Sequence, residues 1–209
     1  MSDPQFSVLL GPDGAGKSTV MAELAERLPT WRALSTDSAF VGPEHALVTQ
    51  LRRNVVEDVL PALGGAYSVD FLASLLQTAV VHLKDRIEAQ EAGVPVLVDS
   101  YYYKILAKCR LAGIEESPMY SWWRSFPQPE RVIYLDVSPE SAWRRSANGA
   151  RLNPLEHFGT RPQWFGFENY QKSLRKLMLE EVRELPVTVI KEQPSAARTA
   201  DAVLEVLAP

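Results

Sequence analysis

Short apolar runs alternate along this chain with longer segments in which apolar residues recur at helical spacing. Five of the runs have the length of strands: Phe6–Leu10, Trp31–Leu34, Val94–Val98, Val132–Leu135 and Val187–Ile190. Near-continuous apolar runs are typical of strands that are covered on both faces, and helical patterns separate them, so we predict βαβ units. The expected fold is one α/β domain over residues 1–209, a five-stranded parallel sheet flanked by helices.

The segments between these runs predict helices, some with recognisable ends. They are Lys17–Leu28, Glu44–Leu60, Val69–Ala92, Tyr103–Leu111, Met119–Phe126, Pro139–Ala147 and Gln163–Leu185. Pro29 ends the first of them, and Ser138 is placed to cap the helix that Pro139 opens. Residues 148–161 are rich in Arg, Gly, Asn and Pro and therefore predict an exposed flap.

The residues directly after the first run follow a pattern that binds polyphosphate. Gly11, Gly16, Lys17 and Ser18 fit G-x-x-x-x-G-K-[ST] between a strand and a helix. Glycines let backbone N–H groups approach phosphates closely, and the helix N-terminus adds partial positive charge. We expect Lys17 to reach the β- and γ-phosphates of a nucleotide and the Ser18 hydroxyl to ligate Mg²⁺. The expected nucleotide-binding residues are Gly11, Asp13, Gly14, Ala15, Gly16, Lys17, Ser18 and Thr19.

A carboxylate is expected near such a loop, because phosphate-bound Mg²⁺ needs one directly or through water. Asp99 ends the apolar run in "GVPVLVDSYYYK", which places it at the edge of an open α/β sheet where ligands bind. We predict that Asp99 organises Mg²⁺ and handles the proton of a phosphoryl acceptor; the alternative is that it caps the next helix. Asp136 ends a similar run, but "DVSPE" favours helix capping there.

Arginines surround the predicted flap in an otherwise acidic protein. They are Arg144, Arg145, Arg151 and Arg161. Because phosphoryl transfer depends on charge stabilisation and positioning, one arginine aimed at the moving group can contribute about 10³–10⁵ in rate. We expect Arg145 and Arg151 to be catalytic. The alternative is a solvated basic helix end, since cations are favoured in a last helical turn.

Composition narrows the classes further. The formal net charge of −4 argues against a general nucleic-acid binder. The single cysteine, Cys109, cannot form an intrachain disulfide, so a reducing, cytoplasmic location is expected, and the start "MSDPQFSVLL" does not read as a secretory signal. No apolar run approaches the roughly 18–20 residues that a membrane span needs. The histidines do not have metal-ligand spacing.

These motifs together resemble thymidylate kinase and its nucleoside monophosphate kinase relatives. The matching stretches are "GPDGAGKST", "VLVDSYYY" and "YLDVSPESAWRR" with a flap after it, in this order over nearly the whole chain. The resemblance implies a P-loop kinase fold with a short arginine-rich LID at about 148–161, ATP and Mg²⁺ as cofactors, and a possible homodimer. It also implies that Asp13 contacts the acceptor, and that Arg145 matches the arginine that follows the family's L-D-x-x-P-E element.

Three positions depart from the family pattern on the side of the acceptor. Thr36 and Asp37 stand where an arginine usually follows the second strand, and the family's D-R pair on the third helix falls near Gln77 and Thr78. Ser100 replaces the arginine of a D-R-Y motif that otherwise corresponds to Asp99 and Tyr101. The loss of bidentate guanidinium groups is expected to weaken binding of a phosphomonoester.

We therefore expect an intact donor site and a diverged acceptor site. The residues expected to contact the acceptor are Asp13, Asp37, Arg53, Gln77 and Tyr101. Arg52 or Arg53 either compensates for the missing arginines or belongs to a solvated helix face. The aromatic residues Trp122, Trp123 and Tyr101–Tyr103 form either a wall for a ring or part of the core.

The sequence predicts an ATP- and Mg²⁺-dependent phosphotransferase with a nucleoside monophosphate or a related small molecule as acceptor. One alternative is a kinase of an uncharged nucleoside or another small metabolite. Another is a non-catalytic P-loop protein that acts as a nucleotide-binding switch or an ATPase.

Overall fold

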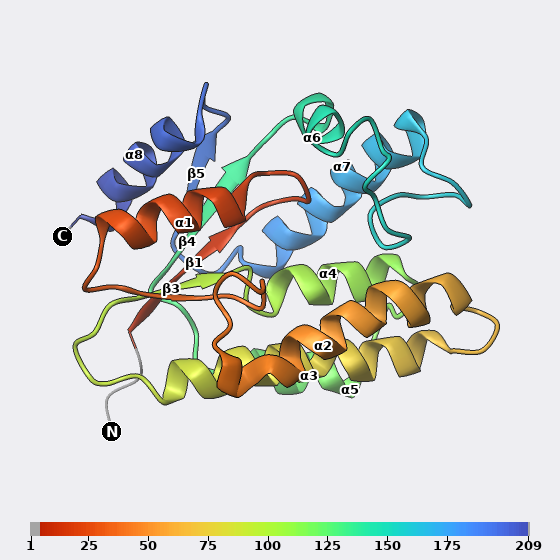
Figure 1. Ribbon diagram of the computed structural model, residues 1–209, viewed down its shortest axis with the longest axis horizontal. Coiled ribbons are helices and arrows are strands. Elements are labelled where there is room, and N and C mark those ends of the chain that lie inside the picture. Colours follow the sequence, from red (N-terminus) through yellow and green to blue (C-terminus); the bar gives the residue numbers. More distant parts are fainter. Residues whose placement is uncertain (1–4, 209) are drawn as a thin grey trace.

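Five parallel strands form one sheet in the order β2-β3-β1-β4-β5 (Figure 1). A computed structural model describes residues 5–208 of the chain. The strands are β1 (Phe6–Leu10), β2 (Arg32–Leu34), β3 (Val96–Asp99), β4 (Arg131–Asp136) and β5 (Val187–Lys191). The predicted five-stranded parallel α/β sheet is confirmed, and its strand ends differ from the predicted ones by one or two residues.

Side chains of the central strands alternate between two core layers. In β1, the side chains of Val8 and Leu10 lie in one layer and that of Leu9 lies in the other. In β4, Tyr134 lies in the first of these layers and Ile133 in the second. Successive side chains of a strand point to opposite faces, so a run that is apolar throughout needs cover on both faces. The sheet is thus packed between two layers of helices.

Helices α1 (Lys17–Arg27) and α8 (Ala196–Leu207) cover one face of the sheet (Figure 1). On the other face lie α3 (Val69–Glu88), α4 (Tyr103–Leu111), α5 (Pro118–Arg124) and α7 (Trp164–Glu181). Helix α8 was not among the predicted helices, although Ala200, Val203 and Leu207 recur at helical spacing and are buried. No helix in the described part of the chain is long and apolar enough to cross a membrane.

The predicted helix Glu44–Leu60 is divided in the structure. A short 3₁₀ turn precedes α2 (Ala46–Asn54), a π turn covers Val55–Val59, and a second 3₁₀ turn covers Leu60–Ala62. Pro61 lacks an N–H group, and its ring would clash with the Glu57 carbonyl in a regular α-helix. The last turns therefore adopt other hydrogen-bond patterns.

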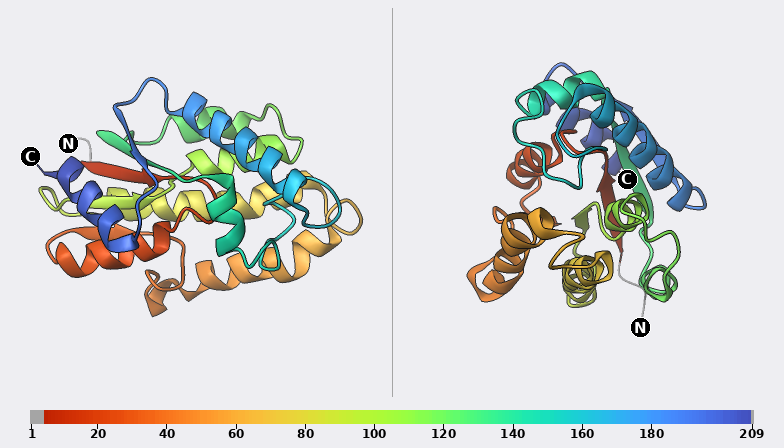
Figure 2. Two further views of the ribbon diagram at one scale, coloured as in Figure 1. Left: turned by 90° about the horizontal axis from the view of Figure 1, so that it is seen from above. Right: turned by 90° about the vertical axis from the view of Figure 1, so that its right-hand side faces the viewer.

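Helices α2 and α3 form a hairpin beside the sheet with a small core of its own (Figure 2). The core contains Val55, Val59, Leu60 and Leu72, and Leu155 of the flap packs against it. The flap lies between α6 (Pro139–Arg145) and α7, and its described residues 146–163 contain neither helix nor strand. The hairpin, the flap and the sheet edge thus lie close to one another.

The cap predicted for α6 is confirmed, because the Ser138 hydroxyl accepts a hydrogen bond from the Ser141 N–H. Asp136 does not cap this helix as expected. Its carboxylate instead pairs with Arg175 at 2.8 Å and with Lys191 at 2.5 Å. Ser138 occupies the cap position, and Asp136 lies two residues before it. The Asp136 carboxylate therefore pairs with cations of neighbouring elements instead.

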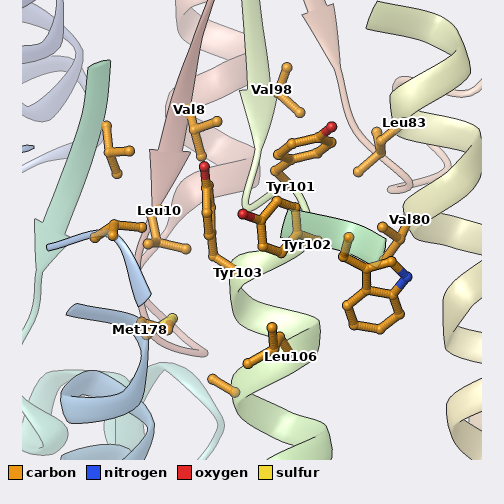
Figure 3. Packing of buried hydrophobic residues seen from close by; sticks show 14 of the residues in the cluster. Val8, Leu10, Val80, Leu83, Val98, Tyr101, Tyr102, Tyr103, Leu106 and Met178 are labelled. Carbon is orange, nitrogen blue, oxygen red and sulfur yellow. The ribbon is translucent and has the colours of Figure 1, made fainter. Parts of the chain in front are cut away.

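The aromatic residues after β3 belong to the core. Tyr101, Tyr102 and Tyr103 are each exposed by 2% or less, and their rings pack among Val8, Leu10 and the α3 and α4 side chains (Figure 3). Trp123 is also buried, whereas Trp122 is half exposed. Of the two alternatives for these aromatics, the core is confirmed for the tyrosines and Trp123.

Candidate active site

The loop between β1 and α1 crosses the carboxyl end of the sheet. Gly14 and Gly16 adopt φ angles of 75° and 83°, which L side chains rarely adopt. A Cβ on Gly11 would lie 2.9 Å from the Leu135 carbonyl oxygen, so this position also requires glycine. Among the described residues, no side chain caps α1, and none in its first turn is acidic. Backbone N–H groups at the start of α1 are therefore available to an anion.

Lys17, the first residue of α1, has a buried side chain directed back over this loop. Its ammonium Nζ donates a hydrogen bond to the Gly11 carbonyl at 3.3 Å. Burial, together with the positive charge of Lys104, lowers the pKa of Lys17 to about 7, although Asp99 and Asp13 oppose the shift. A bound anion would restore the charged form of this lysine.

Hydroxyls and carboxylates form a continuous network beside the loop. The Ser18 hydroxyl donates to the Asp37 carboxylate at 3.1 Å, and the Ser35 hydroxyl donates to the Asp99 carboxylate at 2.9 Å. The Asp37 N–H donates to the Ser35 oxygen at 3.1 Å and joins the two halves. Oxygen ligands of this kind are those that Mg²⁺ prefers. Asp37, expected at the acceptor, lies instead beside the phosphate loop, because β2 ends next to β3 and close to Ser18.

Asp99 lies at the end of β3, where the backbone turns sharply. Ser100 and Tyr101 have φ angles of 59° and 46°, a left-handed conformation that costs roughly 1–2 kcal/mol per residue. The Ser100 hydroxyl donates to Asp99 at 2.8 Å. Burial disfavours ionisation of Asp99, but Lys17 and Lys104 outweigh it and lower its pKa. Asp99 does not cap α4, which begins at Tyr103.

A cavity opens next to Lys17 and Asp99, between α2, α3, α4 and the flap; we call it the α4 cavity. It encloses about 1040 Å³ when the solvent space at its open mouth is included. Its polar lining residues are Asp13, Lys17, Thr36, Arg52, Thr78, Asp99, Ser100, Tyr101, Lys104, Lys108 and Asn153. The rest of its wall is aliphatic.

Two of the expected acceptor residues, Asp13 and Tyr101, line this cavity, whereas Arg53 and Gln77 do not. Their immediate neighbours Arg52 and Thr78 take their places. Successive side chains of a helix are rotated by about 100° about the helix axis, so a shift of one position moves a side chain off the cavity wall. The Arg53 side chain is 64% exposed and lies 4.0 Å from Glu57, in accordance with a solvated helix face.

Two lysines of α4 belong to the cavity and were not predicted. Lys104 lies 2.6 Å and Lys108 3.0 Å from the two carboxylate oxygens of Asp13, with side chains only 13% and 14% exposed. Burial alone would raise the pKa of Asp13, but these lysines hold it far below its usual range. The signal in the sequence was a pair of lysines four residues apart, the first of them five residues after Asp99, flanking the apolar Ile105, Leu106 and Ala107.

The flap arginines have different surroundings. Arg145 donates to the Gly14 carbonyl at 3.1 Å and to Glu192 at 3.0 Å, so it lies at the mouth of the phosphate loop. Arg144 donates to the Ser141 hydroxyl of its own helix. Arg151, expected to be catalytic together with Arg145, has an exposed side chain on the flap. The structure therefore brings Arg145 to the loop and leaves Arg151 at the surface.

A second cavity lies on the opposite side of the loop; we call it the β5 cavity. Its lining residues are Ala15, Gly16, Thr19, Val20, Leu135, Val137, Arg145, Ile190, Lys191, Glu192, Gln193, Ser195, Ala196 and Thr199. They come from the phosphate loop and α1, from the end of β4, from the end of α6, and from β5, α8 and the connection between them. The phosphate loop thus lies between two cavities, and Lys17 lines only the α4 cavity.

This sheet, with a glycine-rich phosphate loop after β1 and a flap after β4, defines a P-loop kinase. A family model described as thymidylate kinase matches residues 10–202. The chain belongs to the thymidylate kinase family and is a thymidylate kinase-like phosphotransferase.

Curated relatives agree with this assignment. A probable thymidylate kinase of Archaeoglobus fulgidus is 24% identical over 204 residues, covering 88% of this chain and 85% of the relative. A probable thymidylate kinase of Pyrobaculum calidifontis is 30% identical over 154 residues, covering 72% and 74%. Membership of the family supports nucleotide kinase activity.

Solved structures share the fold. The thymidylate kinase of Candida albicans superimposes with a TM-score of 0.65 at 14% identity, covering 99% of this chain and 92% of that one. A deoxyadenosine kinase from M. mycoides with dCMP and dCDP bound gives a TM-score of 0.64 at 15% identity, covering 97% and 98%. At such identity the likeness concerns the fold alone.

Proposed function

We propose that this chain transfers the γ-phosphoryl group of ATP to a small nucleotide-like acceptor, with a nucleoside monophosphate as the leading candidate. One observation carries the proposal: Lys17 of the phosphate loop and Asp99 of β3 line the same cavity as the cations of α4. A donor phosphate on the loop and an acceptor in the α4 cavity would therefore meet between Lys17 and Asp99.

The donor side has a place for each part of ATP. The N–H groups at the start of α1 suit the phosphates, and the β5 cavity, beside Gly16 and Thr19, suits the base and ribose. Ser18, Asp37 and Asp99 would hold Mg²⁺, which neutralises phosphate charge when bound. The network of hydroxyls and carboxylates beside the loop supports this set of ligands.

In the transfer step, an acceptor oxygen forms a bond to the γ-phosphorus as the bond to the β-phosphate oxygen breaks and ADP leaves. Lys17 stabilises the charge on the β- and γ-phosphates. Asp99, ionised because of its lowered pKa, orients the acceptor oxygen or accepts its proton. Arg145, already at the mouth of the loop, would supply further positive charge to the donor phosphates. The remaining expectations, a homodimer and a cytoplasmic location, stay predictions.

An acceptor screen tests the proposal. The purified protein is incubated with ATP and Mg²⁺ and with each of a panel of nucleoside monophosphates, thymidine monophosphate among them, and of the matching nucleosides. ADP release and the phosphorylated product are followed by chromatography. We expect turnover of at least one monophosphate. Transfer to nucleosides alone would identify an uncharged acceptor, and ATP binding without transfer to any acceptor would indicate a nucleotide-binding switch or an ATPase.

The two adjacent arginines of α2 are predicted to differ in their effect on the KM of the acceptor. Arg52→Ala is expected to raise the KM of the acceptor by about tenfold, because it removes a cation from the cavity wall. Arg53→Ala is expected to change it by less than about twofold, since an exposed ion pair contributes little. Steady-state kinetics with the acceptor varied at saturating ATP measures both. Equal effects of the two substitutions would contradict the placement of Arg52.

A further inference from the structure

A row of three lysines leads from the phosphate loop into the α4 cavity. Lys17 begins at the loop, and Lys104 is close enough for its charge to lower the pKa of Lys17. Lys108, one helical turn further along α4, continues the row. All three side chains line the cavity. The motifs that carry the family resemblance include neither Lys104 nor Lys108. Their presence in the cavity therefore needs a physical explanation.

Charge in this cavity is unusually concentrated for a protein whose net charge is −4. Four cationic side chains line it (Lys17, Arg52, Lys104 and Lys108), against the carboxylates of Asp13 and Asp99 in its wall and that of Glu156, 3.6 Å from Lys108. Ammonium groups removed from water are costly unless they are paired. The three lysines are balanced by three carboxylates, and Arg52, which is exposed, adds one further cation at the cavity wall, so the site can accept a ligand that brings negative charge.

The two α4 lysines already converge on one anionic group. Lys104 and Lys108 contact opposite carboxylate oxygens of Asp13, at 2.6 Å and 3.0 Å. Lys108 is also 3.6 Å from a carboxylate oxygen of Glu156 in the flap. An ammonium group has three donors, so each lysine retains donors for a ligand. Two cations that contact the two oxygens of a carboxylate are also suitably arranged to bind two oxygens of a phosphate.

We propose that Lys104 and Lys108 bind the phosphate of a phosphomonoester acceptor, in place of the arginines that are absent at Thr36 and Ser100. This rests on the proposed function and names the acceptor class of the same site. Asp13 keeps the two ammonium groups directed into the cavity when the acceptor is absent. Aliphatic residues of the cavity, such as Leu51, Leu76 and Ile105, receive the uncharged body of the acceptor.

An uncharged acceptor explains these contacts less well. A hydroxyl of a nucleoside needs a base or a hydrogen-bond acceptor, which Asp13 or Asp99 would supply without any lysine. The donors that Lys104 and Lys108 retain beside Asp13 would then face a ligand without negative charge. A phosphomonoester instead accepts hydrogen bonds from these remaining donors, so in this proposal the α4 lysines take the place of the absent arginines.

Calorimetric binding without ATP tests this assignment directly. The probes are the four common deoxynucleoside 5′-monophosphates and the four matching deoxynucleosides, each titrated into the wild-type protein. Wild type is expected to bind at least one monophosphate about tenfold or more tightly than its nucleoside. Lys104→Met and Lys108→Met are each expected to weaken binding of that monophosphate by about 10- to 100-fold and to leave the nucleoside unchanged.

Three further variants separate charge from structure. Lys108→Arg keeps the cation and is expected to retain binding within about threefold of wild type. Lys172→Met is the matched control, because Lys172 is 61% exposed on α7 and pairs only with Glu168 of its own helix, at 2.6 Å among the described residues. If Lys108→Met unfolds, Asp13→Asn with Lys108→Met removes both charges of the pair and is expected to show the same loss. Circular dichroism and thermal unfolding establish that each variant folds.

The inference is wrong if no monophosphate binds wild type more tightly than its nucleoside, or if the preference survives both lysine-to-methionine changes. The outcomes also separate it from the proposed function. Phosphoryl transfer to a monophosphate that does not depend on either lysine overturns the inference alone. A lysine-dependent preference for monophosphates without any transfer from ATP overturns the proposed function alone.

Discussion

Lys17→Met is expected to lower kcat for phosphoryl transfer by on the order of 10³-fold while the protein stays folded. The substitution removes the cation that lies over the phosphate loop, at 3.3 Å from the Gly11 carbonyl, and keeps most of the side-chain volume. It also removes a buried ammonium whose pKa is lowered to about 7 by burial and by Lys104. Thermal stability should therefore be equal to or above that of wild type. Steady-state kinetics and thermal unfolding measure the two effects.

Lys176→Met is the control for this change, because Lys176 is 76% exposed on α7 and lies 3.8 Å from Glu180. It should leave kcat within about twofold of wild type. Turnover by Lys17→Met at a rate near wild type would show that the loop lysine does not stabilise the transferring phosphates. A loss of activity accompanied by unfolding would instead make Lys17 a structural residue.

The lowered pKa of Lys17 also predicts a proton linked to ATP binding. In the free protein Lys17 loses its proton as the pH rises through about 7, and the phosphates of ATP favour the charged form. ATP binding at pH 8 should therefore take up a proton, and uptake should disappear near pH 5.5, where Lys17 is already charged. Calorimetry in two buffers with different ionisation enthalpies measures the uptake, which Lys17→Met should abolish.

The loop proposed to bind the donor could be placed because it is local in the sequence. One strand, one loop and the first turn of one helix hold Gly11, Gly16, Lys17 and Ser18 together, and the spacing alone determines their arrangement. Asp99 could be placed for a related reason, since the carboxyl ends of neighbouring parallel strands meet at one edge.

The α4 cavity could not be predicted in the same way, because four separate elements build it. A sequence pattern places a helix but not its rotation, so Arg53 and Gln77 were expected where Arg52 and Thr78 lie. Lysines on a short helix usually indicate a solvated face, and only the approach of Asp13 from the phosphate loop shows Lys104 and Lys108 to be buried. The missing arginines were thus visible in the sequence, but the two lysines of the cavity were not.

Asp99→Asn is expected to lower kcat by about 10²–10⁴-fold with little change in the KM of ATP. The amide keeps the size of the carboxylate and can still accept from Ser35 or Ser100, which donate to Asp99 at 2.9 Å and 2.8 Å. It cannot carry the negative charge that orients the acceptor oxygen and contributes to the Mg²⁺ ligands. Single-turnover kinetics at saturating ATP, with Mg²⁺ varied, measures the chemical step.

The same substitution is expected to have a second effect, on the protonation of Lys17. Asp99 raises the pKa of Lys17, so its neutralisation should shift loss of the Lys17 proton to lower pH and change the pH profile of ATP binding in the same direction. Asp85→Asn serves as the control, since Asp85 is 63% exposed on α3 and lies 3.4 Å from Lys84. If Asp99→Asn retained the wild-type rate and pH profile, Asp99 would be a structural aspartate of the β3 turn, and the acceptor would have to be oriented by Asp13 or Asp37.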